Sequence, residues 1–202
     1  MTVLVRRQLM TGLGAALLGE SVARAEDPPA DRDRSVAENY RLPIADSDRI
    51  VAGATIGVNT AIADVKAILL SFARYKDILP RLQQSRVVAE ENGVTDVYMR
   101  APIMHGLSAI WGVMRFTPPS VWRKRGLQIA GNLTKGNMSV WTGKWMAFPC
   151  GEKRTLLKLE LYIDIDVPVP VSLVNDQLLW ACRFGVTSVR DMAECGATTG
   201  AG

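Results

Sequence analysis

The segment from Lys153 to Val167 constrains the fold most strongly, because apolar and polar side chains alternate along it. Such alternation is typical of a strand in an antiparallel sheet with one buried and one solvent-exposed face. The residues of the predicted buried face are Leu157, Leu159, Leu161, Ile163 and Ile165. A sheet with one apolar face needs a second layer of structure to cover it.

The last segment of the chain is suited to form that layer. Pro168 and Pro170 end the strand, and the sequence after them predicts one helix to about Glu194. Its apolar stripe consists of Val171, Val174, Leu178, Cys182, Gly185, Val189 and Met192. Trp180 and Phe184 widen this stripe into a second apolar face. We therefore expect the helix to lie deep in a groove or to cover something.

Strands are predicted for most of the remaining folded part. Ile50 to Asn59 is the first, followed by one helix that begins at a Thr60 cap and ends near Leu79. The other strands are predicted at 83–91, 95–104, 107–117, 121–130 and 138–148, with a loop at 131–137. The fold class is therefore α+β, with a curved antiparallel sheet of about six or seven strands around a long C-terminal helix. Such a sheet leaves a gap beneath its helix, and small ligands bind in gaps of this kind.

The first 25 residues predict an export signal. Arg6 and Arg7 precede a short apolar stretch rich in Gly and Ala, and Ala23-Arg24-Ala25 offers small residues for cleavage near Ala25. The paired arginines indicate the twin-arginine type, and the alternative is an amphipathic helix of a cytosolic protein. Export predicts a periplasmic or secreted bacterial protein. The remaining divisions are a flexible lead-in at 26–48, a ligand-binding domain at 49–196 and a disordered tail at 197–202.

Charge and cysteine content argue against several kinds of partner. The net charge is +4, and the first 25 residues carry three arginines against one glutamate, which leaves +2 for the rest. The densest basic cluster, Trp122 to Arg125, is predicted to be a solvated turn or strand face, so no nucleic-acid partner is expected. Cys150, Cys182 and Cys195 are expected to be free, with two of them packing. Their spacing predicts no metal site, and no cofactor is expected.

Several short motifs stand out along the chain: Asn59 to Val65, Phe72-Ala-Arg-Tyr75 with Leu79-Pro80, Gly143-Lys-Trp145, and Pro168-Val-Pro170 with Ser172 to Asn175. In this order they resemble the START-like polyketide cyclase and lipid-transport superfamily (SRPBCC, Bet v 1-like). The last of these is similar to the coenzyme Q-binding branch. The resemblance covers about residues 50–194 and implies a helix-grip fold. It also implies a cup beneath the last helix for lipids, sterols, quinones, polyketides or plant hormones.

Candidate ligand-binding residues are aromatic, methionine and arginine side chains in the predicted strands and the last helix. Trp145 and Trp180 are the strongest candidates, because the resemblance directs the first inward and the second lies beside the helix stripe. The others are Trp111, Met99, Met114, Phe184, Arg100 and Arg115. An unpaired buried arginine is very costly, so each arginine is expected to be paired or to face outward. His105, the sole histidine, is a weak catalytic candidate at a strand end.

The leading hypothesis is an exported, non-catalytic carrier for a hydrophobic small molecule or lipid, with contact to a membrane surface during transfer. An enzyme of the cyclase or aromatase type would use the same cavity, with His105 or a buried Arg/Tyr pair as acid and base. A protein-interaction module is the third alternative, and predicted export argues against it. No paired carboxylates, phosphate-binding loop or metal cluster are recognisable in the sequence.

Overall fold

The computed structural model describes residues 35–79, 81–103, 108–165 and 169–199. The strands are β1 (Glu38–Pro43), β2 (Ile50–Val58), β3 (Gln84–Glu91), β4 (Val94–Ile103), β5 (Ser108–Phe116), β6 (Ser120–Trp122), β7 (Gly126–Gly136), β8 (Val140–Pro149) and β9 (Thr155–Asp164). The helices are α1 (Ile62–Leu70), the 3-10 turn η1 (Phe72–Arg74), α2 (Tyr75–Ile78) and α3 (Val171–Thr199).

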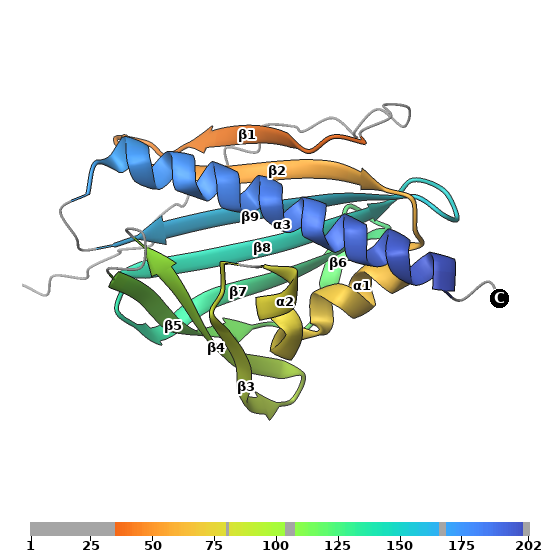
Figure 1. Cartoon of the computed structure of the whole chain (residues 1–202), viewed down its shortest axis with the longest axis horizontal. Coiled ribbons are helices and arrows are strands. Elements are labelled where there is room, and N and C mark those ends of the chain that lie inside the picture. The colour runs from red at the N-terminus through yellow and green to blue at the C-terminus, as the bar shows by residue number, and fades with distance from the viewer. Residues whose placement is uncertain (1–34, 80, 104–107, 166–168, 200–202) are drawn as a thin grey trace, which may run out of the picture. The chain divides into compact units, whose positions relative to one another are not determined.

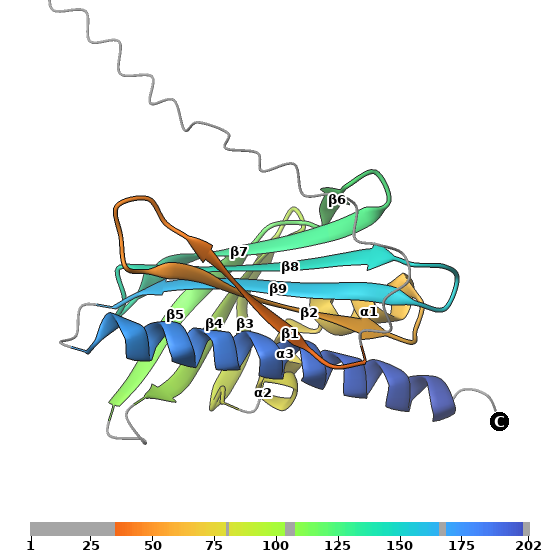
Figure 2. The same ribbon diagram turned by 90° about the horizontal axis from the view of Figure 1, so that it is seen from above.

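The strands form one antiparallel sheet in the order β1-β2-β9-β8-β7-β5-β4-β3, and β6 pairs with β7 at its side. The long helix α3 runs along one face of the sheet and contacts β2, β9 and β1 (Figure 1). Turned by 90°, the same arrangement shows α3 as a separate layer beside β2 and β9 (Figure 2). The predicted α+β fold, a curved antiparallel sheet with a long C-terminal helix, is confirmed. The described residues form nine strands instead of six or seven.

The first additional strand, β1, lies in the segment 26–48 that was predicted to be a flexible lead-in. Glu38–Pro43 pairs with β2 along its whole length, and that part of the prediction is wrong. The Tyr40 ring lies against Gly53, where a Cβ atom would be only 2.2 Å from the ring. The Tyr40 hydroxyl donates a hydrogen bond of 2.9 Å to Glu160. These contacts join residues far apart in the chain, so no local periodicity indicates them.

The second additional strand, β6, results from a turn where the sequence predicted one continuous strand at 121–130. Arg123 and Lys124 adopt φ values of 46° and 61°, in the left-handed region where glycine or asparagine is more usual. The predicted loop at 131–137 is instead mostly the end of β7. Gly131 lies within this strand, and the Phe116 ring packs at the position that a side chain of residue 131 would occupy. This glycine permits close packing and does not form a turn.

The helix predicted from Thr60 to Leu79 is divided into α1, η1 and α2. Its cap residue is Ala61, not Thr60. Side chains satisfy the carbonyl groups at the break: the Tyr75 hydroxyl donates to the Leu69 carbonyl, and the Ser85 hydroxyl donates to that of Phe72, both at 2.6 Å. The division therefore depends on polar side chains that reach the break from other turns and strands.

Helix α3 is seated closely on the sheet. Cys182, Val186 and Val189 are fully buried. Gly185 lies between them, and a Cβ atom there would be 2.9 Å from a methyl group of Leu159. The helix continues to Thr199, past the expected end at Glu194 and into the predicted tail. The Glu194 carboxylate accepts a 2.8 Å hydrogen bond from the backbone of Asn59, which fastens this last part of the helix.

The described helices include none that is both long and apolar enough to cross a membrane.

Candidate functional site

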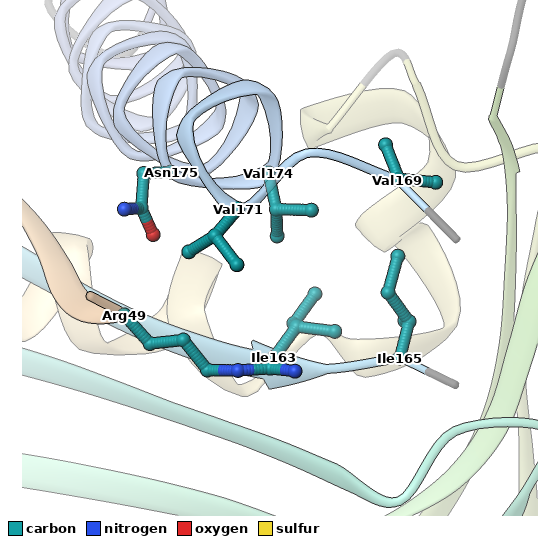
Figure 3. A pocket seen from close by; sticks show the side chains of 7 residues that line it. All are labelled: Arg49, Ile163, Ile165, Val169, Val171, Val174 and Asn175. Carbon is teal, nitrogen blue, oxygen red and sulfur yellow. The ribbon is translucent and has the colours of Figure 1, made fainter. Parts of the chain in front are cut away.

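A narrow crevice lies where β9 ends and α3 begins. Figure 3 shows the side chains that line it: Arg49, Ile163, Ile165, Val169, Val171, Val174 and Asn175. Its volume is about 30 Å³, enough for one or two water molecules. Five of the seven side chains are aliphatic, so the crevice is an apolar gap with two polar groups at its wall.

The aliphatic side of the crevice follows directly from the strand alternation. Ile163 and Ile165 continue the inward-facing row of β9, as the sequence predicted, and both pack against the core. Trp141 on β8 is the cross-strand partner of Ile163 and is 7% exposed. The crevice therefore lies next to the packed core between the sheet and α3.

The first polar group is the Arg49 guanidinium, which forms an ion pair with the Asp164 carboxylate. The two side chains are 31% and 27% exposed, so water partly screens their attraction. Arg49 precedes β2 and Asp164 ends β9, and the two strands are neighbours in the sheet. The pair thus places a positive charge in the crevice wall and its carboxylate partner beside it.

The second polar group is the side-chain amide of Asn175, which is only 7% exposed. Its Nδ2 donates a 2.9 Å hydrogen bond to the Asp48 carbonyl. This bond orients the amide, so that Nδ2 points away from the crevice and Oδ1 lies on the crevice side (Figure 3). Asn175 thus presents an acceptor to whatever enters.

Three of the predicted ligand-binding residues lie in the core between the sheet and the helices. Met99 is 4% exposed, Met114 is 1% exposed and Trp145 is 4% exposed. The tip of the Trp145 ring reaches Gly185 of α3, 3.5 Å from the position of a Cβ atom there. The structure packs these side chains into the core, and their role in binding stays a prediction.

Three other predicted residues lie on the outer face of the sheet, which corrects their assignment to a cavity. Arg115 is exposed and forms two hydrogen bonds with Asp96, of 2.8 and 2.7 Å. Arg100 is exposed and is the cross-strand partner of Trp111. Met99 and Met114 face inward, and side chains alternate along a strand, so the neighbouring positions face outward.

Trp180 and Phe184 also point away from the sheet. They are 39% and 37% exposed, and their rings stack with centroids 5.0 Å apart. The Arg81 guanidinium lies over the Trp180 ring at 4.0 Å, and Arg81 also donates to Gln177 at 2.8 Å. The second apolar face of α3 is therefore a surface, and its expected place inside a groove is wrong.

Comparison with known proteins identifies the fold. No family model and no curated protein matches the sequence. A STAR-related lipid transfer protein from Xanthomonas axonopodis superposes with a TM-score of 0.70 at 13% identity, covering 81% of this chain and 97% of that one. The human StAR-related lipid transfer protein 5 gives a TM-score of 0.68 at 7% identity, covering 83% and 86%. The chain has the START-like fold.

The START-like fold occurs in an enzyme among the matched structures as well. The di-domain aromatase/cyclase of the steffimycin biosynthetic pathway gives a TM-score of 0.56 at 12% identity, covering 82% of this chain and 53% of that one. At these identities the likeness concerns the fold alone. The expected resemblance to START-like proteins and polyketide cyclases is thus confirmed at the level of architecture.

Two wall residues of the START-like domain, Arg49 and Asn175, were missed by sequence reasoning. A signal for Asn175 was present: it follows Val171 by four residues and precedes Leu178 by three, which places a polar side chain on the apolar stripe. Arg49 lies just before a strand and has no comparable signal. His105 lies outside the described residues, so its catalytic role stays a prediction.

Buried titratable groups in the core of the START-like domain are held neutral. Burial raises the pKa of the Cys182 thiol, which donates to the Ala52 carbonyl. Burial likewise raises the pKa of the Tyr75 hydroxyl. Among the described residues, no group of three or more His, Cys, Asp or Glu side chains is placed to hold a metal ion. The described crevice itself offers aliphatic contacts, the Arg49–Asp164 ion pair and the Asn175 amide.

Proposed function

We propose that this START-like domain binds a hydrophobic small molecule, such as a lipid, sterol, quinone or polyketide-like compound, and carries it. The observation that supports this most directly is the crevice, because it lies between the sheet and α3 and most of its lining is aliphatic. Ile163 and Val174 form opposite walls of it, one from the sheet and one from the helix (Figure 3). Ligand sites of soluble proteins are commonly apolar gaps with a few polar groups.

Binding requires the crevice to widen. Its volume of about 30 Å³ is roughly a tenth of the smallest ordinary ligand pocket. The beginning of α3 is the part suited to move, since Leu173 is 49% exposed and Val171 and Val174 are only partly buried. Val186 and Val189, farther along the helix, are fully buried. We propose that the first turns of α3 move away from β9 while the rest of the helix stays in place.

Two measurements test binding. Native mass spectrometry of the gently purified protein is expected to show a co-purified lipid-like molecule, and the fluorescent probe N-phenyl-1-naphthylamine is expected to bind. Val174→Asp would place a carboxylate in the crevice wall and should weaken probe binding by about tenfold or more. Val121→Asp is the matched control, because Val121 is 77% exposed on β6 and its substitution should change nothing. A wild-type protein without co-purified ligand or probe binding would refute the proposal.

We further propose that the carrier touches a membrane when it exchanges its ligand. The stacked pair Trp180 and Phe184 lies outward on the same helix that lines the crevice, with Arg81 over one ring and exposed Arg183 beside them. Aromatic rings with adjacent cations suit the headgroup region of an anionic bilayer. Flotation with phosphatidylcholine and phosphatidylglycerol vesicles should show binding that Trp180→Ser with Phe184→Ser abolishes and Val121→Ser leaves intact. Equal flotation of all three proteins would contradict this part.

Export to the periplasm is proposed from the sequence of the first 25 residues, which lie outside the described residues. Replacing Arg6 and Arg7 by lysines should hold the protein in the cytoplasm of a bacterial host, because the twin-arginine route depends on that pair. Cell fractionation measures the outcome. Export of the lysine variant at the wild-type level would contradict the twin-arginine assignment.

A further inference from the structure

We propose that Asn175 and Arg49 together recognise a hydroxyl group on the hydrophobic ligand. This inference rests on the proposed binding function and names the ligand class: an amphiphile with a neutral, alcohol-type head and an apolar tail. It follows from the orientation of one amide, the neutrality of one ion pair and the size of the crevice.

Asn175 provides the acceptor. An amide side chain has two N–H donors and one oxygen acceptor with two lone pairs. Nδ2 of Asn175 donates a 2.9 Å hydrogen bond to the Asp48 carbonyl oxygen, and the amide oxygen Oδ1 then faces the crevice (Figure 3). The Asn175 residue as a whole is 7% exposed, and a ligand hydroxyl that donates to its amide oxygen would replace a bond to water.

Arg49 provides the donor on the opposite wall. A guanidinium group carries five N–H donors, and the Asp164 carboxylate pairs with it at Nη1. In the close-up the guanidinium extends beneath Ile163, across the crevice from Asn175 (Figure 3). Both residues line the crevice, so it offers a ligand oxygen donors from Arg49 and an acceptor from Asn175. A hydroxyl group is the smallest group that both accepts and donates.

The Arg49–Asp164 pair also determines the preferred charge of the head. An anionic head would approach Arg49 but would also meet the Asp164 carboxylate, and a cationic head would meet the guanidinium. Removing a charge from water without a dedicated partner is costly. The pair therefore favours a neutral head. The volume of about 30 Å³ agrees with this, because it accommodates a water-sized group such as a hydroxyl.

The ligand tail is expected to point inward. The remaining walls are aliphatic: Ile163, Ile165, Val169, Val171 and Val174. Beyond them lies Trp141, the cross-strand partner of Ile163. A tail in this direction displaces apolar contacts between β9 and the first turns of α3, which is the movement that the proposed function requires.

The experiment compares two ligands with the same tail, whose oxygen carries a hydrogen in one and a methyl group in the other. 1-Dodecanol and dodecyl methyl ether compete with N-phenyl-1-naphthylamine for the full chain, and their dissociation constants are measured. One hydrogen bond should make the alcohol bind about fivefold more tightly than the ether. Asn175→Leu should abolish this preference while both ligands still bind, and Gln177→Leu, an amide on the exposed face of α3, should preserve it. Circular dichroism checks that each variant is folded.

The outcomes separate the two proposals. If the wild-type chain binds both ligands equally, hydroxyl recognition is overturned and the carrier function remains. A preference that persists in folded Asn175→Leu also overturns it. If Asn175→Leu does not fold, Arg49→Met replaces it, and a preference that is unchanged in this variant refutes the shared recognition. If neither ligand nor probe binds the wild-type chain, the proposed function itself fails, and this inference fails with it.

Discussion

Replacing Gly53 by alanine should detach the Tyr40 side chain from the outer face of the sheet. The new Cβ atom would lie 2.2 Å from Cζ and 2.3 Å from Cε2 of the tyrosine ring. No such approach is possible, so the ring must leave its position. The backbone at Gly53 is not among the described glycines with positive φ, and alanine fits it without strain. The change therefore acts through Tyr40 alone.

The contacts of Tyr40 indicate the magnitude. Its hydroxyl donates to the Glu160 carboxylate at 2.9 Å, and a hydrogen bond to a charged group is worth about 1.5–3 kcal/mol. The Lys158 ammonium lies 4.7 Å from the ring centroid, which adds about 0.5–1 kcal/mol for a partly exposed pair. Gly53→Ala should therefore lower the free energy of unfolding by about 2–4 kcal/mol, mainly by loosening β1.

Urea denaturation followed by circular dichroism, analysed as a double-mutant cycle, tests this reasoning. Tyr40→Ala should cost about as much as Gly53→Ala, and the double variant should cost little more than either, because the clash disappears with the ring. Asn39→Ala, an exposed neighbour on β1, is the control and should change stability by less than about 0.5 kcal/mol. Equal costs of Gly53→Ala with and without Tyr40 would refute the argument.

Two further predictions concern titratable groups. Cys150 and Cys195 are exposed, whereas Cys182 is buried and its raised pKa keeps the thiol protonated. Ellman's reagent should therefore modify two thiols in the native protein and the third only after unfolding. Fast reaction of all three thiols would contradict the packing of α3. Hydrogen bonds from Arg115 hold the pKa of Asp96 below its usual range. The pair therefore contributes its full stability at pH values above the ordinary aspartate pKa of about 4. This contribution is lost as the pH falls through the lowered pKa. Arg115→Ala should lower the melting temperature at neutral pH and have less effect near pH 3, and a loss that does not depend on pH would show that the pair is not its cause.

The outcome for the cysteines and arginines shows how far sequence reasoning reached. The three cysteines all lie among the described residues and form no disulfide, as expected, but only Cys182 is buried in the core. Arg100 and Arg115 face outward, in line with the expectation that each would be paired or exposed. The basic cluster at Trp122 to Arg125 includes a turn, which is one of the two alternatives expected for it, although the continuous strand predicted across it at 121–130 is wrong. The predictions for the arginines succeeded because burying a charge or an unpaired polar group is costly wherever it occurs.

The candidate site could be predicted only in part, because its residues come from separate elements. Ile163 and Ile165 were identified by alternation along one strand. Asn175 could have been recognised as a polar residue on the stripe of α3, but its partner at Asp48 could not. Arg49 acquires its role only because β2 pairs with β9, which brings Asp164 beside it. No pattern within a single segment contains this information.

The sequence by itself determined the period of each long element and its apolar face, because a strand repeats every two residues and a helix about every 3.6. These periods were enough to predict the alternating strand at β9, the C-terminal helix and the position of Gly185 on the buried stripe of that helix. The tertiary structure decided which apolar faces are covered. Trp180 and Phe184 continue the apolar pattern of α3, yet they face outward, because the buried arc of the helix is limited to the side that meets the sheet. The tertiary structure also decided the pairing of β1 with β2 through Tyr40 and Gly53, since this pairing depends on contacts between residues of different strands.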